Sequence, residues 1–131
     1  MTVTIQQKLI DKLKSSNTET MRIGFQKIPA KSLRELIRLD SSAIFRQVTC
    51  PMLLIGGEKD LQCDPADVGR IAELANGTVE AHVVQNLTHV LRFDERQPSL
   101  FGSSELIKKP LEPIVVELIS TWINKQLHVS T

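Results

Sequence analysis

A run of apolar residues at positions 52–55 (Met-Leu-Leu-Ile) constrains the fold of this chain more than any other feature. A strand that is apolar at every position is buried on both faces, which is typical of a parallel sheet. Asp64-Pro65 then predicts a helix start, and Asn76-Gly77 predicts its end in a left-handed turn. The alternating segment 79–84 predicts a second strand. Together these segments predict a right-handed βαβ unit and an α/β fold.

The segments on either side of this unit have helical patterns. Residues 3–48 predict three or four short helices, with capping boxes at Thr4 and Ser32 and a helix over residues 21–28 that Pro29 ends. A long irregular stretch, 92–109, precedes a C-terminal helix over residues 113–127. The chain therefore divides near residue 49 into a helical segment, 1–48, and an α/β segment, 49–131, which we expect to form one compact domain.

Composition excludes several classes of function. The net charge of +1 and the absence of tyrosine give no reason to expect nucleic acid as a partner. No apolar run approaches the roughly 18 residues of a membrane span, and the first residues do not resemble a signal peptide, so we expect no membrane partner and a cytoplasmic protein. The cysteines, Cys50 and Cys63, do not make a disulfide framework or a metal set, and no cofactor is implied.

Two residues that can carry chemistry follow the predicted strands. Asp60 comes after Gly56-Gly57, and His89 lies just beyond the second strand. An acid and a histidine at the C-terminal ends of neighbouring strands can form the charge-orienting half of a catalytic triad. The sequence contains no Gly-x-Ser-x-Gly segment, so it shows no nucleophile on a strand-to-helix turn. The alternative is that Asp60 is a turn residue and His89 an ordinary loop histidine.

Four further residues have side chains that can carry chemistry. Cys63 lies three residues after Asp60 and could approach His89 as an alternative nucleophile, although a small residue beside a helix start is the commoner use of a free cysteine. Ser103 and Ser104 lie in the irregular stretch and are predicted to be loop residues. His82 is predicted to lie on the polar face of its strand.

Residues 51–60, residues 87–91 and the closing helix resemble the C-terminal end of an α/β-hydrolase, in a branch of serine-peptidase-like or dienelactone-hydrolase-like enzymes. The resemblance implies that Asp60 is the catalytic acid after the family's seventh strand and that His89 is the catalytic histidine after the eighth. It also implies that residues before Cys50 are the end of a cap. The family's first six strands, oxyanion loop and nucleophile elbow are not in this sequence. The chain therefore resembles a truncated member of the family, a fragment, or a small protein descended from the end of a hydrolase.

A missing sixth strand would leave the strand at 52–55 with an unpaired edge, which is a template for association. We therefore expect a homodimer, a domain-swapped dimer or a complex with a complementary hydrolase chain. Three functions stay open. The chain is a part of an acyl hydrolase that needs a nucleophile from another chain, or an inactive dimerising or protein-binding module, or a small hydrolase whose nucleophile is Cys63.

Overall fold

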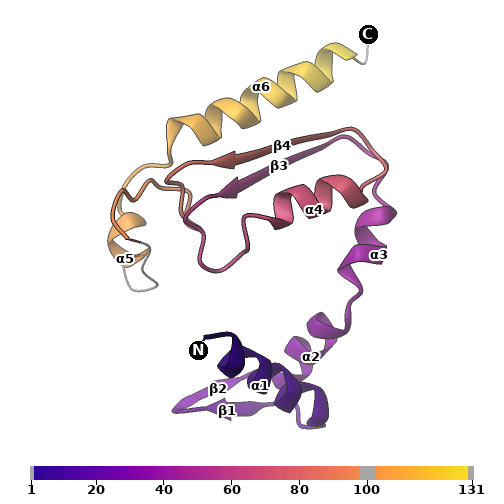
Figure 1. Ribbon diagram of the computed structural model, residues 1–131, viewed down its shortest axis with the longest axis vertical. Coiled ribbons are helices and arrows are strands. Elements are labelled where there is room, and N and C mark those ends of the chain that lie inside the picture. Colours follow the sequence, from indigo (N-terminus) through magenta and orange to yellow (C-terminus); the bar gives the residue numbers. More distant parts are fainter. Residues whose placement is uncertain (1, 98–102, 130–131) are drawn as a thin grey trace. The chain divides into compact units, whose positions relative to one another are not determined.

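The computed structural model of the protein describes residues 2–97 and 103–129. Within these residues the fold is mixed α/β, as predicted, with a small parallel sheet and several helices (Figure 1). The chain divides into two compact units, residues 1–41 and 42–131. No helix in the described part of the chain has the length and apolar character needed to cross a membrane.

The first unit contains helix α1 (Thr2–Ser15), strands β1 (Met21–Ile23) and β2 (Gln26–Ile28), and helix α2 (Ala30–Arg38). The predicted helix over 21–28 is wrong, because these residues form an antiparallel hairpin in which Met21 pairs with Ile28. Gly24 takes a left-handed conformation, with φ of 59°, and so allows the tight reversal. The predicted capping boxes are also wrong, since Thr4 and Ser32 lie inside α1 and α2.

A small apolar core holds the first unit together. Leu13, Met21 and Ala30 are buried, and Leu9, Ile28, Leu33 and Ile37 pack against them. Arg34 is also buried, and its guanidinium donates hydrogen bonds to the Thr18 carbonyl at 2.9 Å and to the Ser16 hydroxyl at 3.3 Å. Arg34 therefore ties α2 to the segment between α1 and the hairpin.

The second unit is built on the predicted strand, helix, strand sequence. It contains α3 (Ser41–Arg46), β3 (Met52–Gly57), α4 (Asp67–Leu74), β4 (Val79–Val84), α5 (Ser103–Leu106) and α6 (Pro113–Val129). Strands β3 and β4 pair in parallel, from Met52 opposite Val79 to Gly57 opposite Val84, which confirms the predicted parallel pairing. Figure 1 shows α4 on one side of the two strands and α6 on the other.

Three local predictions in this unit are wrong. Helix α4 begins at Asp67 with Ala66 as its N-cap, instead of at Pro65 with Asp64 as its N-cap. Helix α4 ends at Leu74 with Ala75 in an extended conformation, and Gly77 does not adopt a left-handed φ. Gly77 is needed for another reason, because a Cβ there would collide with the Cys50 carbonyl oxygen. Ser103 and Ser104 begin α5 instead of lying in a loop.

Strand β3 is less buried than the sequence predicts. Residues 52–56 are half-buried, although their apolar run is typical of a strand that is covered on both faces. The reason is the small size of the sheet. Within residues 2–97 and 103–129, its strands are β3 and β4. The edge of β3 that faces away from β4 is therefore unpaired in the described part of the chain.

Candidate active site

The turn after β3 fixes the orientation of Asp60. The Asp60 amide donates to the Gly57 carbonyl at 3.1 Å, which closes the turn. One carboxylate oxygen, Oδ1, accepts hydrogen bonds from the amides of Gln62 at 2.8 Å and Cys63 at 2.9 Å. An aspartate that bonds the backbone two and three residues ahead is a common turn device. This arrangement engages one oxygen and directs the other, Oδ2, away from the turn.

The loop after β4 is held by its own backbone. Leu87 is fully buried and its carbonyl accepts the Lys59 amide at 3.0 Å, so the two loops meet at this residue. Thr88 donates its hydroxyl to the Arg92 carbonyl at 2.8 Å and accepts the Leu91 amide at 2.9 Å. Leu91 has φ of 58°, which is costly for a leucine and persists only where the surroundings impose it. His89 is thus presented from a constrained loop.

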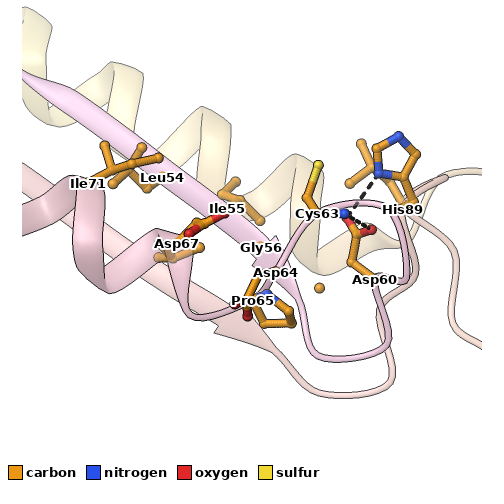
Figure 2. Close-up of a pocket in the computed structure, with 13 residues that line it drawn as sticks. Leu54, Ile55, Gly56, Asp60, Cys63, Asp64, Pro65, Asp67, Ile71 and His89 are labelled. Carbon is orange, nitrogen blue, oxygen red and sulfur yellow. Dashed lines mark hydrogen bonds and ion pairs between the residues drawn. The ribbon is translucent and has the colours of Figure 1, made fainter. Parts of the chain in front are cut away.

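Asp60 and His89 meet between these loops. His89 Nδ1 lies 2.9 Å from Asp60 Oδ2, and the Asp60 side chain is 12% exposed while that of His89 is 42% exposed (Figure 2). In a neutral imidazole the hydrogen on Nδ1 donates to the carboxylate, which leaves Nε2 as an acceptor. Burial raises the pKa of the Asp60 carboxyl, but hydrogen bonds from the Cys63 amide, the His89 ring and the Gln62 amide together hold it below its ordinary value. The carboxylate is therefore the favoured form of Asp60.

A pocket of about 310 Å³ opens beside the pair. Its lining comes from β3, the Asp60 turn, the start of α4 and the His89 loop: Leu54, Ile55, Gly56, Gly57, Asp60, Cys63, Asp64, Pro65, Asp67, Val68, Ile71, His89 and Leu91. Figure 2 shows the aliphatic side chains of Leu54, Ile55 and Ile71 along one side of this space. The pocket therefore combines an apolar wall with a histidine, a thiol and carboxylates.

Comparison with known proteins assigns no family. No family model, no curated protein and no solved structure matches this chain. The resemblance to α/β-hydrolases therefore stays a prediction, and the site must be interpreted from its own geometry.

Cys63 lies with the pair. Its sulfur, one ligand nitrogen of His89 and one carboxylate oxygen of Asp60 all lie within 4.8 Å of one another. The side chain of Cys63 is exposed and its thiol is free. From the sequence, this approach is expected only for a nucleophile, and two cysteines do not make a metal set. The spacing of three residues between Asp60 and Cys63 is nevertheless a usable signal for a metal site.

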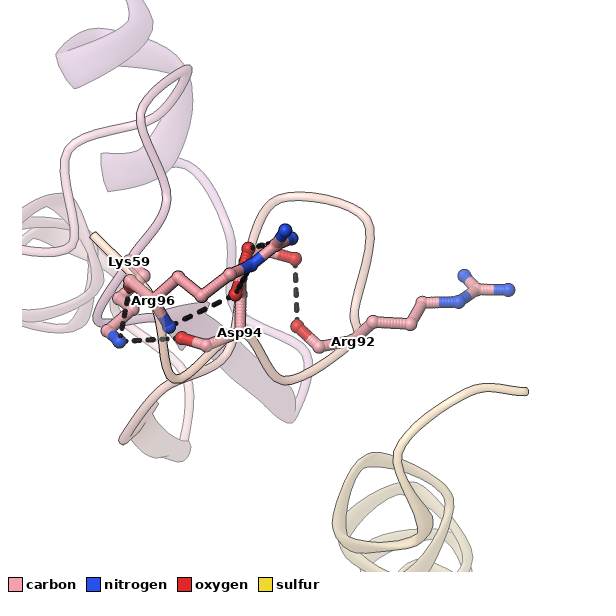
Figure 3. Close-up of polar contacts among 5 residues, drawn as sticks. Lys59, Arg92, Asp94 and Arg96 are labelled. Atoms are coloured by element: carbon pink, nitrogen blue, oxygen red, sulfur yellow. Dashed lines mark hydrogen bonds and ion pairs between the residues drawn. The ribbon is translucent and has the colours of Figure 1, made fainter. Parts of the chain in front are cut away.

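A polar cluster that the sequence analysis missed fixes the chain beyond His89 (Figure 3). The Lys59 ammonium donates to the carbonyls of Asp94 at 2.6 Å and Arg96 at 3.0 Å. The Arg96 guanidinium donates to both carboxylate oxygens of the buried Asp94, at 2.8 and 2.9 Å. Hydrogen bonds from Arg96 lower the pKa of Asp94 from 3.8 to about 2. Lys59, the neighbour of Asp60, is therefore a structural tie between the two loops.

Gly57 allows the two loops to approach. A Cβ at this position would collide with the Leu87 carbonyl oxygen and would lie 2.8 Å from the carbonyl carbon. The atoms it would meet are backbone atoms, which cannot turn aside as a flexible side chain can. A glycine here is therefore a condition for the short distance between Asp60 and His89.

The other singled-out residues lie elsewhere. His82 Nε2 is 3.0 Å from Glu80 Oε1 on β4, and Lys125 of α6 pairs with the same carboxylate at 3.0 Å. Ser103 and Ser104 are in α5, as described above. The structure therefore brings together Asp60, His89 and Cys63 out of the residues that the sequence analysis weighed for chemistry.

Proposed function

We propose that the Asp60–His89 pair is the acid and base half of a Ser-His-Asp acyl hydrolase, and that another chain supplies the nucleophile. The observation that carries the proposal is the 2.9 Å contact between His89 Nδ1 and Asp60 Oδ2, formed where two parallel strands end. In such a triad the histidine takes the hydroxyl proton of the nucleophile, and the acid holds the imidazole in one tautomer and stabilises the imidazolium. Asp60 and His89 have the atoms for these two roles.

The orientation of Asp60 supports this assignment. Its Oδ1 is occupied by the amides of Gln62 and Cys63, so Oδ2 is the oxygen left for the imidazole. A carboxylate with a lowered pKa stays ionised at neutral pH and can stabilise the charged ring. The His89 side chain is 42% exposed and Asp60 engages its Nδ1, so Nε2 is the nitrogen that we expect an incoming hydroxyl to reach.

The unpaired edge of β3 supports a nucleophile from another chain. A hydrolase of the family that this chain resembles would place further strands, the oxyanion loop and the nucleophile along that edge. In the described residues the edge carries no strand, and the pocket beside Asp60 and His89 is lined by β3 residues. A complementary chain that paired with β3 would therefore bring its own residues to the pair. The substrate class is an ester or a similar acyl compound.

The test is coexpression with a hydrolase fragment that carries the first six strands and the nucleophile elbow. We expect a complex that hydrolyses a short-chain chromogenic ester, and we expect loss of that turnover in His89→Ala and Asp60→Asn. General acid–base catalysis contributes on the order of 10²- to 10⁴-fold, which sets the size of the loss. A failure to form the complex, or turnover that is the same in His89→Ala, would contradict the proposal. Turnover by the chain alone that disappears in Cys63→Ser would assign the nucleophile to that thiol instead.

An inactive dimerising module is the second candidate, and a patch on α6 favours it. Val116, Ile119, Ile123 and Leu127 are each more than 40% exposed and recur at helical spacing. This apolar stripe and the open edge of β3 are surfaces that a second copy of the chain could cover. Light scattering at high concentration measures the outcome, and a monomer would count against this candidate.

A further inference from the structure

We propose that Asp60, Cys63 and His89 bind one divalent transition-metal ion, with Zn²⁺ as the best fit. This inference goes beyond the proposed hydrolase role, because it uses the thiol and gives the pair a second chemistry. One donor atom from each residue, a carboxylate oxygen, a thiol sulfur and an imidazole nitrogen, lies within 4.8 Å of the others. A set of sulfur, nitrogen and oxygen donors suits Zn²⁺ or Co²⁺, whereas Mg²⁺ and Ca²⁺ prefer oxygen alone.

The distances are close to those of a tetrahedral site. Zinc lies about 2.0–2.2 Å from nitrogen and oxygen ligands and about 2.3 Å from sulfur, so neighbouring donors lie about 3.4–3.6 Å apart. His89 Nδ1 and Asp60 Oδ2 are already 2.9 Å apart. The Cys63 side chain is exposed, so a rotation about its own bonds can bring the sulfur to the ion. Figure 2 shows this sulfur beside the imidazole at the end of the pocket.

The surroundings hold two of the three donors in place. The amides of Gln62 and Cys63 fix Oδ1 of Asp60, which leaves Oδ2 as a single directed ligand. Outer contacts of this kind orient metal ligands and strengthen binding. The His89 loop is fixed by the bonds of Thr88 and by the buried Leu87.

The charges around the pocket also favour a cation. Asp64 and Asp67 line it together with Asp60, and one guanidinium, from Arg70, pairs with both of them. The ammonium of Lys59 is bound to backbone carbonyls of the loop at 94–96. The local excess of carboxylates raises the concentration of cations at the pocket mouth.

Binding of the ion changes the protonation of two ligands. The Cys63 thiol gives its proton to solvent and binds as thiolate, while the proton of the neutral imidazole moves from Nδ1 to Nε2 so that Nδ1 can bind. The metal then takes the place of the hydrogen between His89 and Asp60. The metal-bound form and the acid–base form of the pair therefore exclude each other. With three protein ligands, a fourth position stays open, as in catalytic zinc sites.

Co²⁺ is the probe for this site, because its complexes with thiolates absorb light. We expect the reduced, metal-free chain to bind one Co²⁺ with a sulfur-to-cobalt charge-transfer band and tetrahedral visible bands, and we expect Zn²⁺ to remove both. Cys63→Ser should lose the charge-transfer band and bind about 100-fold more weakly, since changes even to outer contacts cost 10- to 100-fold. Cys50→Ser is the matched control, because Cys50 is also free and exposed but lies outside the cluster.

The outcomes decide the proposal without reference to hydrolysis. Absence of the charge-transfer band in a large excess of Co²⁺ would overturn it, and so would an unchanged band in Cys63→Ser or in His89→Ala. Loss of the band in Cys50→Ser would also overturn it, because the thiolate would then come from the wrong cysteine. Ester turnover is measured separately, on the metal-free complex with the nucleophile-bearing fragment. Co²⁺ binding by the chain, together with a complex that shows no turnover, would refute the proposed function alone.

Discussion

Substitution of Gly57 by alanine tests the close approach of the Asp60 and His89 loops. The added Cβ would collide with the carbonyl oxygen of Leu87 and would lie 2.8 Å from its carbonyl carbon. Carbon atoms in good contact are about 3.5–4.0 Å apart, so the Leu87 backbone would have to retreat by about 0.7 Å or more. It cannot do so freely, because its amide and carbonyl are bonded to Val84 and Lys59 and its side chain is fully buried.

The expected cost follows from these contacts. Overpacking of a well-packed region costs about 1–3 kcal/mol, and the lower backbone entropy of the unfolded alanine chain offsets about 0.4–1 kcal/mol of it. The net loss is therefore about 0.5–2 kcal/mol. A loss of 1 kcal/mol lowers the Tm of a domain of this size by about 4–8 °C. The displaced backbone, at Leu87, is two residues before His89, so the hydrogen bond between His89 and Asp60 should lengthen as well.

Thermal unfolding followed by circular dichroism measures the loss, and Gly69→Ala is the matched control. Gly69 lies inside α4 and a Cβ there meets nothing within 4 Å, so alanine should stabilise the protein by about 0.5–1 kcal/mol. The imidazole proton resonance of the Asp60–His89 pair should be lost in Gly57→Ala and kept in Gly69→Ala. A Gly57→Ala protein that is as stable as the wild type and keeps that resonance would refute the reasoning.

Two further substitutions test polar contacts, one inside each unit. In the folded protein the pKa of Asp94 is about 2, below the ordinary 3.8, so the ionised carboxylate stabilises the fold above pH 4. Asp94→Asn should lose this stabilisation, which the wild type itself loses as the pH falls through about 2. The urea midpoints of Asp94→Asn and the wild type should therefore differ at pH 6 and converge at pH 2. Glu95→Gln, at an exposed position, is the control. A difference between the midpoints that is the same at both pH values would contradict this prediction. Arg34→Met should cost about 1.5–3 kcal/mol, since a buried hydrogen bond from a charged group to the Thr18 carbonyl is lost. Amide exchange in α1 and the hairpin measures it, and unchanged rates would show that Arg34 does not hold this unit.

The strand, helix, strand core of the second unit could be predicted from the sequence because its signals agree. The apolar run at 52–55 and the alternating run at 79–84 each specify a strand, and Asp64-Pro65 indicates the helix between them, although α4 begins two residues later, at Asp67. Parallel strands end at the same edge, so the residues after them, Asp60 and His89, had to lie close together. The hydrogen bond between them follows from that topology and from Gly57.

The hairpin of the first unit could not be predicted in the same way. Met21, Phe25 and Ile28 recur at helical spacing, but Phe25 is fully exposed and the other two pair across the hairpin. A short apolar pattern fits both periods, and Gly24 decides between them by its left-handed φ. The polar cluster around Asp94 could not be predicted either. Lys59 binds the backbone carbonyls of residues 94 and 96, which are far from it in the sequence, and a backbone carbonyl is the same whatever the side chain is.

The two oxygens of Asp60 have opposite surroundings, and this makes the position intolerant of an amide. Oδ1 faces two donors, the amides of Gln62 and Cys63, so an asparagine must place its own oxygen there and its NH₂ toward His89. That NH₂ can only donate, and Nδ1 must then give up its hydrogen and accept. The ring proton moves to Nε2, which becomes a donor instead of an acceptor. The turn after β3 therefore dictates, through two backbone amides, the direction in which a proton can travel at the far side of the histidine ring.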